Sequence, residues 1–99
     1  IFFFYKTYYN MKMCIGFVKE KDVNSVLELF PEEASYYFCS PAIARGLNVD
    51  TLKEIATAKG LQGDAYSSVA EALNAAKAQA LPTDFIFVGG STFVVAEVL

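Results

Sequence analysis

Short apolar runs alternate with amphipathic stretches along nearly the whole chain. The apolar runs have the length and composition of strands and lie at 11–18, 34–39, 62–66 and 85–88. Three sets of apolar residues recur at helical spacing between them: Val23, Val26, Leu27 and Phe30; Leu52, Ile55 and Ala56; Val69, Leu73 and Ala76. The run at 85–88 carries no polar residue, which predicts a strand that is buried on both faces of a parallel sheet.

Residues that start or stop helices stand where this pattern changes. Asp22 is placed to cap the first helix, and Gly60 stands where a left-handed residue ends the second. Ser68 and Glu71 have capping-box spacing, in which the hydroxyl and the carboxylate each bond to a backbone amide. The chain therefore predicts four strands separated by helices.

Strict alternation of strands and helices with short connections is typical of a parallel sheet covered on both faces. The predicted fold class is α/β, a three-layer Rossmann-like domain with a mainly parallel sheet. We assign this domain to 9–99 and interpret 1–8 as the remnant of a truncated preceding segment. The pattern leaves the order of the strands open.

Composition narrows the classes of function. The 99 residues are 55% hydrophobic, enough for the core of one domain, and a net charge of −3 gives no electrostatic basis for binding nucleic acid or an anionic membrane. The absence of His excludes acid–base catalysis and metal ligation by that residue. Cys14 and Cys39 lack Cys-x-x-Cys spacing, so we expect reduced, buried thiols in a cytoplasmic protein.

Three segments that follow predicted strands carry candidate binding residues. Lys21 and Asp22 suit an anion site or, more simply, a helix cap with a solvated lysine. Arg45 suits bidentate carboxylate binding or an ordinary exposed loop. Gly90 and Ser91 suit an anion site and a helix N-cap, and these two interpretations are compatible. Neither a P-loop nor a dinucleotide-binding glycine motif occurs in the chain.

The same three segments carry a family resemblance. They read Gly16-Phe-Val-Lys-Glu-Lys-Asp22, Ser40-Pro-Ala-Ile-Ala-Arg45 and Phe87-Val-Gly-Gly-Ser-Thr-Phe-Val-Val-Ala-Glu-Val-Leu99. In this order they resemble the C-terminal domain of the bifunctional dihydrofolate synthase/folylpolyglutamate synthases, within the Mur ligase superfamily. The resemblance covers about residues 9 to 99 and implies an N-terminally truncated chain with the Mur ligase C-terminal type of α/β domain.

The resemblance implies an ATP-dependent amide ligase of folate biosynthesis. Such an enzyme adds L-glutamate to dihydropteroate, or to the γ-carboxylate of a folate, through an acyl phosphate. ATP and Mg²⁺ would be bound mainly by a missing upstream domain, on which this one would pack. We therefore expect the chain alone to be inactive, with no catalytic residue and no metal ligand of its own.

The resemblance also implies roles for individual residues. Arg45 and Ser91 match positions on the glutamate side of the substrate site. Lys21, Asp22 and Gly90 match positions that order a loop or lie near the nucleotide.

Two positions depart from the family pattern, and two other interpretations stay open. Ala44 replaces a usual Pro, and Glu20 replaces a frequent Asp. The first alternative is a ligase of peptidoglycan precursors from the same superfamily. The second is a non-catalytic α/β module that binds a small anion or a partner.

Overall fold

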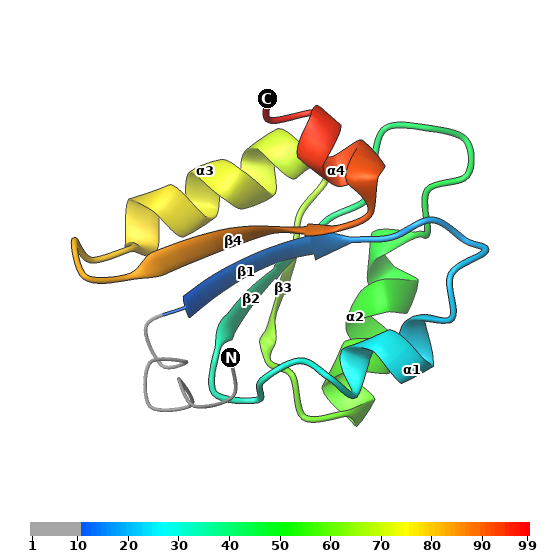
Figure 1. The fold of residues 1–99 in the computed structure, drawn as a ribbon, viewed down its shortest axis with the longest axis horizontal. Helices are drawn as coiled ribbons and strands as arrows, with labels where there is room; N and C mark the ends of the chain where they lie inside the picture. The colour runs from blue at the N-terminus through cyan, green and yellow to red at the C-terminus, as the bar shows by residue number, and fades with distance from the viewer. Residues whose placement is uncertain (1–10) are drawn as a thin grey trace.

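The protein forms three layers, with a four-stranded parallel sheet between two pairs of helices (Figure 1). This computed structural model describes residues 11–99, so the interpretation of 1–8 lies outside the described residues. The strands are β1 (Met11–Gly16), β2 (Ser35–Phe38), β3 (Gly63–Ala65) and β4 (Phe85–Gly90). The helices are α1 (Val23–Leu27), α2 (Val49–Ala58), α3 (Val69–Gln79) and α4 (Thr92–Ala96). The predicted three-layer α/β class is confirmed.

The strand order, which the sequence left open, is β3-β2-β1-β4, with every neighbouring pair parallel. The chain runs outward from β1 to β3 with α1 and α2 on one face of the sheet. It then returns through α3, on the opposite face, and places β4 on the far side of β1. The direction of winding therefore reverses between β1 and β4.

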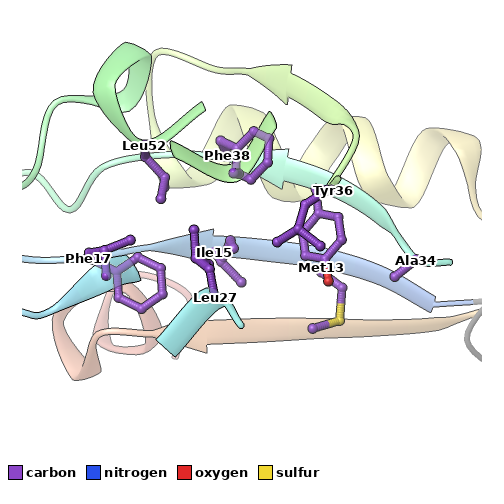
Figure 2. Packing of buried hydrophobic residues seen from close by; sticks show 11 residues of the cluster. Met13, Ile15, Phe17, Leu27, Ala34, Tyr36, Phe38 and Leu52 are labelled. Carbon is purple, nitrogen blue, oxygen red and sulfur yellow. The ribbon is translucent and has the colours of Figure 1, made fainter. Parts of the chain in front are cut away.

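The larger core lies under the α1–α2 face of the sheet. Alternate residues of β1 and its continuation, Met13, Ile15 and Phe17, point into it and meet Leu27 and Leu52 from the helices (Figure 2). This two-residue period is the strand pattern that the apolar run at 11–18 predicted. The end of β1 therefore rests on closely packed, buried side chains.

The second core lies under α3 and α4 and contains Cys14, Cys39 and Val94, all fully buried. Both cysteines are unpaired thiols, as predicted. Burial raises the pKa of Cys14 to about 11 and that of Cys39 to about 12, so both thiols are protonated at neutral pH. Their role is packing.

The predicted helix starts are confirmed, but the first helix is shorter than its apolar spacing predicted, because α1 ends at Leu27 and leaves Phe30 outside it. Asp22 accepts from the Ser25 amide, and Gly60 has a φ of +86° just after α2. Ser68 accepts from the Glu71 amide, but the return half of the expected capping box is wrong. The Glu71 carboxylate accepts from the hydroxyl of Ser67, the residue before the N-cap, instead of from a backbone amide.

The expectation that the run at 85–88 is buried on both faces is wrong. The side chains of Phe85 and Phe87 are 64% and 40% exposed, whereas Ile86 and Val88 pack against the second core. The reason is the strand order, because within residues 11–99 β4 is an edge strand, and α3 and α4 cover only its other face. Among the described residues, no helix is both long enough and apolar enough to cross a membrane.

Candidate functional site

The candidate site lies at the carboxyl ends of β1 and β4, where the winding of the sheet reverses. In open α/β sheets this reversal creates a crevice, since the loops that follow the two strands lead to opposite faces. Gly16 and Gly90 end the two strands side by side. Gly90 has a φ of +97°, and a Cβ there would lie 2.4 Å from the Gly16 carbonyl oxygen. Only glycine fits at position 90, so no side chain covers the backbone there.

The loops after β1 and β2 are joined to each other beside this edge. The Lys19 amide donates to the Arg45 carbonyl over 2.8 Å, and the Leu47 amide donates to the Phe17 carbonyl over 2.7 Å. These hydrogen bonds place the backbone of Arg45 directly next to the loop that leaves β1. The two loops that the sequence singled out separately therefore form one structure.

A second glycine makes the Arg45 loop compact. A Cβ on Gly46 would lie 2.5 Å from the Pro41 carbonyl oxygen and 2.7 Å from the Ser40 hydroxyl. The Gly46 amide also donates to the Ile43 carbonyl over 3.0 Å. The loop thus folds back on its own start, which limits where the Arg45 side chain can reach.

The Arg45 side chain lies over an aromatic ring. Its guanidinium carbon lies 5.3 Å from the centre of the Phe93 ring, within cation–π range. Arg45 is exposed and Phe93 is 40% exposed, so the pair lies at the surface of the site. Sequence reasoning missed Phe93, and the only signal for it was an aromatic residue shortly after the Gly-Gly-Ser turn.

The end of α4 holds the same loop at a second point. The Glu97 carboxylate accepts a hydrogen bond from the Ala42 amide over 2.6 Å. Hydrogen bonds to an ionised acceptor are stronger than neutral ones. Glu97 was also missed from the sequence, because nothing local indicates a partner that lies 55 residues away.

Ser91 begins α4 at the carboxyl end of β4. Its hydroxyl oxygen accepts from the Phe93 amide over 3.1 Å, so the interpretation as a helix N-cap is confirmed. A hydroxyl that accepts one hydrogen bond keeps its own hydrogen as a donor. Ser91 and Arg45 are thus joined through one short helix.

Lys21 and Asp22 lie where α1 begins. The Asp22 carboxylate accepts from the Ser25 hydroxyl and amide, and these two hydrogen bonds hold the pKa of Asp22 below its ordinary value. Lys21 is exposed, and within residues 11–99 its ammonium forms no ion pair. The helix-cap interpretation of Asp22 is therefore confirmed, and the nearby lysine remains available to solvent.

No metal site is built from the described residues by themselves. Within 11–99, His, Cys, Asp and Glu side chains form no group of three or more that could hold a metal ion. Gly90, Ser91 and Arg45 offer backbone amides, a hydroxyl and a guanidinium, which suit an organic anion.

The fold defines a doubly wound α/β domain whose candidate site lies where the winding of the sheet reverses, and comparisons with known proteins narrow its class further. No family model matches the chain. A curated relative from Haloferax volcanii, a probable bifunctional folylpolyglutamate synthase/dihydropteroate synthase, is 34% identical over 93 residues, which is 91% of this chain and 11% of the relative.

Solved structures agree with this match. E. coli FolC in complex with DHPP and ADP has a TM-score of 0.76 at 28% identity, over 90% of this chain and 21% of that chain. A bifunctional folylpolyglutamate synthase/dihydrofolate synthase with Mn, AMPPNP and L-glutamate bound shares the fold, with a TM-score of 0.78 at 23% identity over 94% and 22%. The chain thus spans about a tenth of the curated relative and about a fifth of the solved structures. Its resemblance to the C-terminal domain of folylpolyglutamate synthase/dihydrofolate synthases is confirmed.

Proposed function

We propose that this domain is the C-terminal part of an ATP-dependent ligase that adds L-glutamate to dihydropteroate or to the γ-carboxylate of a folate. One observation carries the proposal. Arg45 and Ser91, which follow different strands, are joined through α4 at the edge where the winding of the sheet reverses. Further support comes from the proteins that the chain resembles, which include a probable bifunctional folylpolyglutamate synthase/dihydropteroate synthase and a bifunctional folylpolyglutamate synthase/dihydrofolate synthase.

Arg45 is the residue that we assign to the substrate glutamate. The contact with the Phe93 ring accepts no hydrogen bond from the guanidinium in its plane, so the N–H groups of Arg45 stay available for a bidentate carboxylate. Within 11–99, no acidic side chain lies within ion-pair distance of Arg45. The guanidinium therefore has room for a carboxylate from a ligand.

Ser91 is assigned to the same substrate. Its hydroxyl oxygen is held by the Phe93 amide, which leaves the hydroxyl hydrogen to donate to a carboxylate oxygen. With Arg45 it would fix the incoming amino acid so that its amino group meets the activated carbonyl. Positioning of this kind supplies much of the rate in a two-substrate reaction.

ATP supplies the activation in this proposal. The γ-phosphoryl group passes to the acceptor carboxylate, ADP leaves, and the glutamate amine then displaces phosphate from the acyl carbon. Two similar structures hold ADP with DHPP, and AMPPNP with Mn and L-glutamate. This chain has no P-loop, so we assign Lys21, Asp22 and Gly90 a place near the nucleotide and leave the main phosphate and Mg²⁺ contacts to residues outside it.

The test compares the 99-residue chain with the protein encoded by the complete reading frame that contains it. Each is incubated with ATP, Mg²⁺, labelled L-glutamate and either dihydropteroate or a reduced folate, and the products are separated by mass. We expect labelled product and ADP from the complete protein and none from the chain alone. A parallel reaction offers the complete protein a peptidoglycan precursor as the acceptor. Addition to that precursor, or no ATP-dependent addition to any acceptor, would overturn the assignment.

A further inference from the structure

Two contacts tie α4 to the loop that carries Arg45. The Phe93 ring lies under the guanidinium at 5.3 Å, and the Glu97 carboxylate accepts from the Ala42 amide at 2.6 Å. Positions 93 and 97 are four residues apart, so they project from the same side of a helical turn. Both contacts are therefore made by one face of one short helix.

We propose that Phe93 and Glu97 are positioning residues, which hold the Arg45 guanidinium at a fixed place relative to Ser91 so that both receive the same amino-acid carboxylate. Phe93 holds the guanidinium through the cation–π contact, and Glu97 holds the loop from which Arg45 extends. This inference rests on the proposed function, because it takes Arg45 and Ser91 as the glutamate-side residues.

α4 sets the distance between Ser91 and Glu97. Ser91 caps its start and Glu97 its end, six residues apart, which corresponds to about 9 Å of helix. Val94, between them, is fully buried in the second core and anchors the helix to the sheet. A shift of Glu97 relative to Ser91 would therefore require the core to repack.

The charges around Arg45 favour an incoming carboxylate over an internal one. Glu97 is the acidic residue tied to this loop, and its carboxylate bonds to the Ala42 amide. Within 11–99 it forms no ion pair with the Arg45 guanidinium. Glu97 thus orders the loop without occupying the guanidinium rim.

The first measurement follows the side chain of Arg45 by NMR in the 99-residue chain. In the wild-type chain we expect an Arg45 Nε–Hε resonance shifted by the Phe93 ring, with a heteronuclear NOE typical of an ordered group. Phe93→Leu and Glu97→Ala should each move this resonance toward its random-coil position and lower the NOE. Glu97→Gln should restore both, since an amide oxygen also accepts from the Ala42 amide.

Matched controls separate this effect from a general loss of order. Phe85→Leu removes another exposed aromatic ring, at the opposite end of β4, and Glu54→Ala removes an exposed carboxylate on α2. Neither should change the Arg45 signal. Dispersed amide spectra establish that each variant folds. If Phe93→Leu does not fold, the comparison of Glu97→Ala with Glu97→Gln still tests the proposal.

The second measurement titrates the same chains with L-glutamate and follows Arg45 and Ser91. Ordering a long side chain on binding costs free energy, so Phe93→Leu and Glu97→Ala should weaken the affinity for L-glutamate about threefold to tenfold. Glu97→Gln should weaken it much less. An ordered Arg45 in Phe93→Leu and Glu97→Ala would overturn the positioning roles, whatever glutamate does. An Arg45 released by these variants but insensitive to glutamate in the wild type would overturn the glutamate-side assignment instead.

Discussion

Replacing Gly90 by alanine should destabilise the domain through contact with backbone atoms. Gly90 lies at φ +97°, where L-residues with a Cβ are strained, and its position at the end of β4 presses it against β1. The new Cβ would lie 2.4 Å from the Gly16 carbonyl oxygen and 3.0 Å from the Phe17 ring. The carbonyl belongs to the central strand and cannot move aside without disturbing the sheet.

The magnitude has two parts. Positive φ costs an alanine about 1–2 kcal/mol relative to glycine. Relief of the contact with the Gly16 carbonyl adds the cost of overpacking, roughly 1–3 kcal/mol. We therefore expect Gly90→Ala to lower the free energy of unfolding by about 2–5 kcal/mol, a large fraction of the stability of a small domain.

Gly60→Ala is the matched control, because Gly60 also has a positive φ, +86°. The nearest atoms to its new Cβ are in the Glu32 carboxylate, at 3.2 Å, and a flexible side chain can move away. This control should lose only the first part, about 1–2 kcal/mol. Both variants are unfolded in urea and followed by far-UV circular dichroism. Equal losses of stability in the two would refute the close backbone approach at the candidate site.

Three further predictions concern other parts of the fold. A hydrogen bond from the Leu81 amide is the main reason that the pKa of the Asp84 carboxyl lies below its ordinary value. The stability that it provides is therefore complete above the unfolded-state pKa of about 4 and lost as the pH falls below that value, and Asp84→Asn should flatten this part of an acid titration followed by urea unfolding. Because burial raises the pKa of Cys14 to about 11 and of Cys39 to about 12, neither thiol should react with a disulfide reagent at pH 8 until urea is added. Reaction of both thiols in the folded protein would contradict this expectation. Ser68→Ala removes the N-cap of α3 and should lower the free energy of unfolding by about 1 kcal/mol. An unchanged free energy of unfolding would count against the capping role of Ser68.

Local signals in the sequence were enough for the element order and most helix ends. Asp22, Gly60 and Ser68 act through neighbours within a few residues, so their spacing alone predicted what they do. The alternation of strands and helices similarly determined the parallel sheet, since short connections leave few other arrangements. The carboxyl-edge location of the candidate residues followed from the same reasoning.

Features that depend on distant parts of the chain were not predictable from the sequence. Whether Phe85 is buried depends on which strand lies beside β4, and the apolar run looks the same at an edge and in the interior. The contact between Glu97 and Ala42 joins positions 55 residues apart. Phe93 and Arg45 follow β4 and β2, and they meet across the end of β1, which lies between those two strands. Such contacts depend on tertiary packing, and no spacing of neighbouring residues in the sequence indicates them.

The central claim is that Arg45 receives the glutamate of a ligase reaction, and the steady-state KM of the complete protein for L-glutamate tests it most directly. Loss of a hydrogen-bonded charge should raise that KM about 10-fold to 100-fold in Arg45→Ala, with the KM for ATP unchanged. An equal rise in both constants, or no change in the KM for glutamate, would contradict the account.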